Sequence, residues 1–425
     1  MRIITKPIIS WALYDWANST FATTVMAGFF PVFFKNYWSA GSDVTESTFQ
    51  LGMANSLASI VIMILAPILG AIADKGGVRK KFLLFFTLMG VVMTGGLYFV
   101  EQGRWELAVL LYMAASVGFA GGNIFYDALV VAVAPKDKLD VVSALGYSLG
   151  YLGGGLLFAL NVAMTLWPQT FGLADAAQAV RVSFVMVAVW WAVFTIPAMV
   201  FVQEPGATGR QTFADMISGG WLQVVATFHH IRGLRPVWLF LIAYWCYIDA
   251  VDTIIRMAVD YGMSLGFEAK NLIVALLITQ FVGFPAALVF GKLGEHFGAK
   301  SGIYTAIAVY IGITLWAMNM DKVIEFYLLA AIIGLVQGGI QSLSRSLFAS
   351  MIPPDKSGEF FGFYNMLGKF ATVLGPVLMG VVGVLTGSPR LSLLAVIGLF
   401  VVGAVVLYFV DTGEGRRSAR VLDRA

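Results

Sequence analysis

The chain has 425 residues, of which 59% are hydrophobic and only 12% are charged, and its mean hydropathy is +0.84. A soluble domain carries roughly twice that charged fraction, so we expect no water-soluble domain of any size. The formal net charge of +3 does not indicate a nucleic-acid partner. Cys246 is the single cysteine and the three histidines lie in polar loops, so we predict no disulfide framework, metal site or cofactor.

Apolar segments of about 20 residues, each long enough to cross a bilayer, recur from one end of the chain to the other. They must be helical, because backbone polar groups in lipid have to bond to one another. The sequence therefore predicts an all-α membrane protein with spans near 10–35, 48–73, 82–100, 106–133, 140–163, 181–202, 237–261, 270–291, 301–320, 323–350, 358–386 and 390–410.

Positive charge alternates between the two sets of loops that connect these spans. The set that includes both termini holds most of the lysines and arginines, among them Lys80 and Arg416. The positive-inside rule places this set, and both termini, in the cytoplasm. The expected location is a plasma membrane, and the short loops favour a bacterial inner membrane.

The longest loop divides the spans six and six. We therefore predict an N-terminal bundle over 1–202, a cytoplasmic linker over 203–236, and a C-terminal bundle with a short tail over 237–425. Four linker residues share one helical face, which favours a helix lying on the inner membrane surface: Trp221, Val225, Phe228 and Ile231. An irregular linker is the alternative.

The two sets of six spans also resemble each other in sequence. Shifts of 218, 221 and 234 residues align PKDK (135–138) with PPDK (353–356), Asp127 with Arg345, GAIAD (70–74) with GKLGE (291–295), and Asp15 with Asp249. These matches place spans 1, 2, 4 and 5 on spans 7, 8, 10 and 11 in order. Two related six-helix halves are typical of major facilitator transporters.

The loop after span 2 reads GAIADKGGVRKK (70–81) and resembles the signature of the major facilitator superfamily at this place, with one extra residue before the basic pair. The resemblance implies a latch that holds the halves together when the cytoplasmic side is closed. It consists of Gly70, Asp74, Gly77, Arg79 and Lys80. The small Gly70 allows close helix packing, and Asp74 suits a helix N-terminus or an arginine. Positive-inside charge alone would explain the bases but not the glycine or the aspartate.

Three further segments resemble a narrower family, which contains the fungal autophagy-related vacuolar amino-acid effluxer and its bacterial relatives. They are YDWANSTFATTV (14–25), SALGYSLGYLGG (143–154) and SRSLFASMIPP (344–354). This resemblance implies a twelve-span secondary carrier, with amino-acid export as the activity of the fungal member.

Seven ionisable residues lie well inside predicted spans: Asp15, Asp127, Asp249, Asp252, Arg256, Arg345 and Lys369. Each costs about 2.5–3.5 kcal/mol at the centre of a bilayer if it is left unpaired, so they must pair or face water. They occupy spans 1, 4, 7, 10 and 11, and in major facilitators spans 1, 4, 7 and 10 line the central cavity. We therefore expect them around a hydrated cavity.

Polar residues share a helical face with these charges. The predicted substrate-binding or proton-coupling set consists of Asp15, Asn18, Asn123, Tyr126, Asp127, Asp249, Asp252, Arg256, Gln341, Arg345, Asn365 and Lys369. Counting from the span ends puts four of these residues in the cytoplasmic half of the membrane: Asp15, Asp127, Arg345 and Lys369.

We hypothesise that Arg345 or Lys369 pairs across the halves with Asp127 or Asp15. Such a pair would serve as an inner gate or as the site for a solute that carries both charges. A carboxylate in a poorly hydrated cavity can bind and release protons, and Asp127 and Asp15 are the leading proton carriers. An ion pair that only fixes helix packing is the alternative.

The leading interpretation is a proton-coupled secondary carrier, acting as a monomer, for a small zwitterionic solute such as an amino acid. The alternative within transport is an exporter of amphipathic compounds, favoured by intramembrane aromatics and by GYLGG (150–154), which partly matches an antiporter motif. An intramembrane lipid-modifying enzyme is disfavoured, because the sequence has neither GxxxxGK[ST] nor HExxH.

Overall fold

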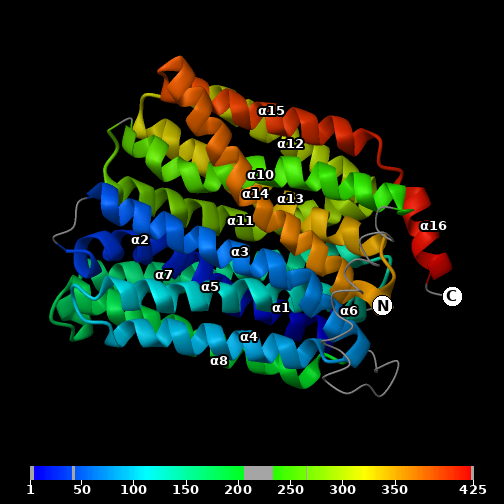
Figure 1. Ribbon diagram of the computed structural model, residues 1–425, viewed down its shortest axis with the longest axis horizontal. Helices are drawn as coiled ribbons and strands as arrows, with labels where there is room; N and C mark the ends of the chain where they lie inside the picture. Colours follow the sequence, from blue (N-terminus) through cyan, green and yellow to red (C-terminus); the bar gives the residue numbers. More distant parts are fainter. Residues whose placement is uncertain (1–3, 41–43, 205–232, 265, 423–425) are drawn as a thin grey trace.

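The computed structural model describes residues 4–40, 44–204, 233–264 and 266–422, and all regular structure within them is helical. Twelve long helical segments follow one another close to the predicted positions (Figure 1). They are α1 (Lys6–Thr20) continued by η1 (Phe21–Phe29), α2 (Phe30–Phe33) and η2 (Phe34–Trp38); α3 (Val44–Gly76); α4 (Arg79–Gly96) with η3 (Leu97–Phe99); α5 (Trp105–Ala128) with α6 (Val130–Val133); α7 (Leu139–Leu166); α8 (Ala176–Phe201); α10 (Arg235–Ser264); α11 (Ala269–Phe297); α12 (Ala299–Ala317); α13 (Val323–Ser350); α14 (Ser357–Thr386); and α15 (Pro389–Tyr408). The prediction of an all-α membrane protein is confirmed.

Within the described ranges, three shorter helices lie outside these segments: η4 (Pro168–Phe171), η5 (Pro354–Lys356) and α16 (Thr412–Leu422). Among the described residues, nine helices are long and apolar enough to cross a membrane. The first segment is not one of the nine, since its α-helical part ends at Thr20 and gives way to a π-helix. A π-helix has an i→i+5 hydrogen-bond pattern and often marks a functional site. The hydrophobic pattern of the sequence does not distinguish it from an α-helix.

The helices divide into a first half (α1–α8) and a second half (α10–α16). In Figure 1 the helices run side by side along the long axis, with α10, α12 and α15 on one side and α1, α4 and α8 on the other. The halves meet where α3 packs against α14 and where α7 packs against α11 and α13. Helices α6 and α16 lie at the same end of the molecule, which we call the terminal end (Figure 1).

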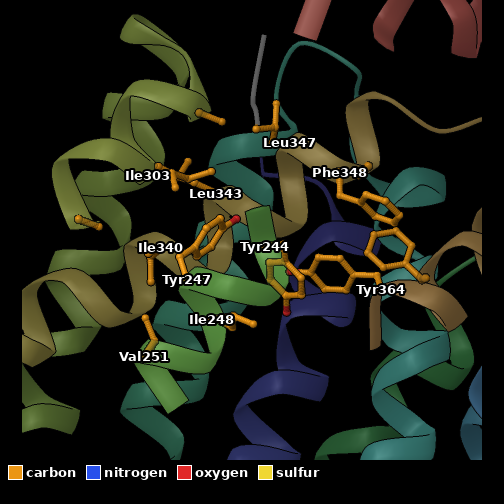
Figure 2. Packing of buried hydrophobic residues seen from close by; sticks show 14 of the residues in the cluster. Tyr244, Tyr247, Ile248, Val251, Ile303, Ile340, Leu343, Leu347, Phe348 and Tyr364 are labelled. Atoms are coloured by element: carbon orange, nitrogen blue, oxygen red, sulfur yellow. The ribbon is translucent and has the colours of Figure 1, made fainter. Parts of the chain in front are cut away.

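Both halves contain stacked, buried aromatic rings. In the second half, Tyr244 of α10 stacks on Tyr364 of α14 with ring centroids 4.1 Å apart, and Phe348 of α13 stacks on Tyr364 at 5.0 Å (Figure 2). In the first half, Phe30 stacks on Tyr112 at 3.9 Å. These rings fix the angles between helices and so position the polar side chains described below.

Large apolar side chains on the outside of the bundle are exposed. Phe85 is 60% exposed and Val384 is 85% exposed. Such a surface would aggregate in water, whereas lipid solvates it. The predicted linker helix and the residues that define it fall within 205–232, outside the described residues.

Candidate functional site

A buried charged cluster joins the two halves in the terminal half of the molecule. Arg345 lies five residues before the end of α13, and its Nη1 is 3.0 Å from Asp127 Oδ1 on α5 and 3.9 Å from Asp15 Oδ2 on α1. The three residues are 1%, 7% and 8% exposed, respectively. One cation of the second half is therefore held between two carboxylates of the first, away from the lipid.

Ser143, near the start of α7, holds the same guanidinium. Arg345 Nε donates to Ser143 Oγ at 2.9 Å, and Nη2 donates to the Ser143 carbonyl at 2.8 Å. Ser143 Oγ in turn donates to the carbonyl of Ser342 on α13 at 2.7 Å. Each of the three guanidinium nitrogens thus donates to a group of the first half, and α13 is fixed to α5 and α7.

Aromatic rings of the first half surround the guanidinium. Its Cζ lies 4.3 Å from the ring centroid of Tyr147, 4.9 Å from that of Trp11 and 5.2 Å from that of Tyr126. Cations over aromatic faces are stabilised, most strongly where water is absent. These rings partly replace the hydration that Arg345 loses on burial.

The two carboxylates have further hydrogen-bond partners. Asp15 accepts from the Tyr126 hydroxyl at 3.1 Å and from Ser19 Oγ at 3.2 Å. Asp127 Oδ2 accepts from Asn365 Nδ2 of α14 at 3.2 Å. Asp127 is therefore bound by two helices of the second half.

Glycines of α7 let α1 and α5 approach the cluster. A Cβ at Gly146 would lie 2.6 Å from the Tyr126 hydroxyl, and a Cβ at Gly150 would lie 3.0 Å from Asp15 Oδ1. The first distance is shorter than real Cβ atoms show and the second is shorter than most of them show, so a side chain at either position would displace its neighbour. The glycines of this helix thus allow close packing at the charged cluster.

The other predicted site residues lie in different places. Asn18 donates to Asn123 at 2.6 Å within the first half. Asp249 is fully buried in the second half, where it accepts from the Gly375 N–H at 2.9 Å. Asp249 therefore joins α10 to α14 next to Pro376.

Three more predicted residues are half-buried on helices of the second half: Asp252 on α10, Gln341 on α13 and Lys369 on α14. The side chain of Arg256 lies outside the described part of the chain.

The predicted latch lies at the terminal end, between α3 and α14. Asp74 accepts from the backbone N–H of Gly358 at 2.9 Å and of Glu359 at 2.7 Å. These are N–H groups of the first turn of α14, which have no partner within their own helix. Asp74 therefore caps a helix of the opposite half and complements its dipole.

Arg79 binds the same carboxylate and also reaches across the halves. Its Nε donates to Asp74 Oδ1 at 2.6 Å, and its Nη2 donates to the Asp355 carbonyl at 2.8 Å. Gly70 lies against α14, because a Cβ there would be 2.1 Å from the Gly358 carbonyl oxygen. Gly77 has a φ of +57°, which lets the chain turn sharply between α3 and α4.

Glu204, just after α8, supports this latch and was not among the predicted residues. Its carboxylate accepts from the backbone N–H groups of Arg79 and Lys80, the first two residues of α4, while Lys80 Nζ donates to the Val202 carbonyl at 2.6 Å. Burial raises the pKa of the Glu204 carboxyl, and the two N–H donors oppose that rise.

A second polar contact joins the halves between α7 and α11. Lys138, just before α7, forms an ion pair with Glu295 near the end of α11, and the hydrogen bond to Glu295 raises the pKa of Lys138. Next to it, a Cβ at Gly291 would lie 2.4 Å from Ala144 Cβ. Within the described ranges, no three His, Cys, Asp or Glu side chains group as a metal site would need.

The family model described as "Vacuole effluxer Atg22 like" matches residues 40–138 and 131–420. The chain is 39% identical over 412 residues to the MFS-type transporter YxiO of Bacillus subtilis, an alignment that covers 96% of each chain. It is 24% identical over 503 residues to autophagy-related protein 22 of Saccharomyces cerevisiae, with 98% of this chain and 94% of that protein covered.

Solved structures of major facilitator transporters share the fold. The human organic anion transporter MFSD10 matches with a TM-score of 0.74 at 15% identity, covering 95% of this chain and 99% of that one. The proton:xylose symporter XylE matches with a TM-score of 0.70 at 13% identity, covering 98% and 97%. The relatives and structural neighbours are transporters, so the prediction that this protein is not an enzyme is confirmed. The chain belongs to the Atg22-like effluxer family and is a membrane transporter of the major facilitator superfamily.

Proposed function

We propose that the protein moves a small polar or zwitterionic solute, similar to an amino acid, across a bacterial inner membrane by alternating access coupled to protons. The observation that carries this proposal is the buried contact of Arg345 with Asp127 and Asp15. It supplies one cation and two carboxylates where the halves meet, which suits a solute with one amino and one carboxylate group.

In the described arrangement, this contact acts as a closed gate. Every nitrogen of Arg345 already donates to the first half, so the guanidinium is held by the protein itself until the halves separate. Separation leaves buried charges without partners, which costs several kcal/mol per ion. A solute that offers a carboxylate to Arg345 and an amino group to Asp15 replaces the lost partners and lowers this cost.

The proposed proton-binding groups are the carboxylates of Asp127 and Asp15. Protonation of Asp127 removes its charge and weakens its attraction to Arg345, an attraction that is strong at 3.0 Å in a poorly hydrated site. Gate opening would then coincide with proton uptake. The latch and the Lys138–Glu295 pair lie at the same end and would open with it.

The proposed orientation puts the terminal end in the cytoplasm, because the loops at this end carry the excess of lysine and arginine. The proposed domains are a bundle over 1–202 and a bundle over 237–425, joined by the linker over 203–236. We propose that each monomer transports independently, since the charged cluster is complete within one chain.

A thermal-shift screen of the purified protein against amino acids, peptides, nucleosides and sugars tests the substrate class. We expect stabilisation by amino acids, through binding to the folded state, and not by sugars or nucleosides. Stabilisation by lipophilic cations alone would contradict the proposed class.

Proton coupling is tested with Asp127→Asn in liposomes that contain a pH-sensitive dye. We expect the variant to lose solute-driven proton movement, because the amide cannot be protonated at physiological pH. The control is Ser183→Ala, which alters a buried serine that donates to the Ala179 carbonyl of its own helix. Unchanged proton movement in Asp127→Asn would exclude Asp127 as the carrier.

A further inference from the structure

A cavity of about 260 Å³ lies on the side of the charged cluster away from the terminal end. Most of its wall comes from α10–α15, and one side is closed by Ala22, Thr23 and Ala27 of η1. Thr23 follows Asp15 by eight residues, and Gln337 precedes Arg345 by eight. At 1.5 Å per residue, the cavity is about 12 Å from the charged cluster along both helices.

The wall of this cavity is mostly aliphatic. Three of its hydroxyl groups donate to backbone carbonyls of neighbouring helical residues, so they do not offer a hydrogen atom to a ligand: Tyr261 to Ala317, Thr279 to Ala275 and Ala330, and Thr314 to Tyr310. The remaining polar groups include the amides of Gln280 and Gln337. Among the lining residues that the structure describes, none carries a formal charge.

The size and apolar character of this wall determine which ligands the cavity can bind. A charged group that entered would lose its hydration without gaining an opposite charge, at a cost of many kcal/mol. An apolar molecule would gain about 25 cal/mol for each Å² of surface removed from water. An apolar cavity of about 150 Å³ already binds benzene, so a cavity of about 260 Å³ has room for two fused rings.

We propose that this cavity is a binding site for an uncharged hydrocarbon of one or two rings, separate from the charged cluster. The site does not depend on which solute the protein transports. Its wall includes residues of both halves, so an occupant contacts η1 and the second half together and stabilises this arrangement of the halves.

Naphthalene tests the site, with the full chain in lipid nanodiscs and the midpoint of thermal unfolding as the readout. We expect saturating naphthalene to raise the midpoint by about 2–4 °C. Naphthalene-2-sulfonate has the same rings with a charge and should give no shift. Equal shifts from the two compounds would overturn the proposal.

Two variants locate the binding. Ala330 lines the cavity, whereas Ala331, the next residue of α13, does not. Ala330→Leu fills part of the space and should abolish the naphthalene shift, whereas Ala331→Leu should preserve it. A shift retained in Ala330→Leu would overturn the proposal, because the compound would then bind elsewhere or act through the bilayer.

A third variant tests binding in the cavity independently, in case Ala330→Leu does not fold. Leu393→Ala removes a side chain from the wall, so the larger anthracene should stabilise this variant more than it stabilises the natural sequence. Equal stabilisation would count against the cavity. A co-purified phospholipid that only Leu393→Ala or Ala330→Leu releases would identify an acyl chain as the occupant and would also overturn the proposal.

Discussion

Arg345 is the residue on which the contact between the halves depends most. Its charge is almost completely buried, yet two carboxylates, one serine and three aromatic rings of the first half surround it. Breaking a buried ion pair by removing one partner typically costs about 3–5 kcal/mol. The interactions of this single side chain therefore account for much of the stability of the closed arrangement.

Ser143→Ala tests this account at the residue scale. The variant removes the acceptor of Arg345 Nε and leaves that donor buried, which costs about 1–3 kcal/mol. The closed arrangement should become about 5–150-fold less favoured relative to the open one. Hydrogen exchange measured by mass spectrometry should accelerate in the first turns of α7 and the last turns of α13.

The control is Ser183→Ala. This variant removes a buried hydroxyl that donates to the Ala179 carbonyl of its own helix. This variant should leave the exchange of α7 and α13 unchanged. If the two variants behave alike, Ser143 has no special part in closing the gate.

The sequence predicted a pair of Arg345 or Lys369 with Asp127 or Asp15 without deciding among them, and in the structure Arg345 contacts both aspartates. Arg345 and Asp127 carry formal charges in apolar spans, so the cost of burial alone indicates a partner for each. Ser143 carries no charge and precedes a run of glycines, so nothing marks it as an arginine ligand, although it lies one turn before Tyr147. Asp249 is also an ionisable residue inside an apolar span. In the structure, however, its carboxylate accepts a hydrogen bond from the Gly375 N–H and does not join the cluster.

At the scale of helices, the contact of α3 with α14 combines close packing with capping. Gly70 and Gly358 allow the backbones to approach, and Asp74 then reaches the first N–H groups of α14. Opening the interface exposes these N–H groups and separates Asp74 from the helix dipole. These contacts therefore stabilise the described arrangement, in which α3 packs against α14.

Gly70→Ala should weaken this latch. Its new Cβ would meet the Gly358 carbonyl oxygen at 2.1 Å, and because that atom is backbone, the helices have to move apart. We expect faster hydrogen exchange at the start of α14, with a loss of about 1–3 kcal/mol as for other overpacked sites.

The matched control is Gly52→Ala on the same helix, where no described residue lies within 4 Å of the new Cβ. This substitution should be neutral or slightly stabilising, because alanine favours a helix by about 1 kcal/mol over glycine. Equal effects of the two substitutions would show that helix propensity, not the contact with α14, determines the result.

Helix positions were largely predictable, because each span is an apolar run bounded by polar residues. The extent of α13, Val323–Ser350, agrees with the predicted span. The π-helical η1 was not predictable, because the change from i→i+4 to i→i+5 hydrogen bonding depends on packing, such as that of Gly28 against Phe158.

Glu204 was missed because it lies beyond the predicted span, where an isolated acidic residue is ordinarily solvated.

For the molecule as a whole, the two interfaces between the halves are related by the internal repeat. The repeat aligns GAIAD (70–74) with GKLGE (291–295). Accordingly α3 packs against α14, and its counterpart α11 packs against α7. Asp74 binds the start of α14, and Glu295 binds Lys138 at the start of α7. The terminal end is thus held at two places, one on each side of the charged cluster.

A charge exchange between Lys138 and Glu295 tests the second contact. Lys138→Glu and Glu295→Lys should each accelerate hydrogen exchange at the start of α7, because like charges then face each other. The double variant should recover most of the protection, with a coupling energy of about 0.5–3 kcal/mol. Additive effects without recovery would mean that this pair does not hold the halves together.

Asp127 and Arg345 are themselves aligned by the 218-residue shift, and yet they touch each other. Two equivalent positions can be in contact only if the pseudo-twofold axis passes between them. Two identical halves would place the same residue at both positions, so no ion pair could form between them. An attraction of opposite charges across this axis is therefore available only to halves whose sequences differ here, as Asp127 and Arg345 do.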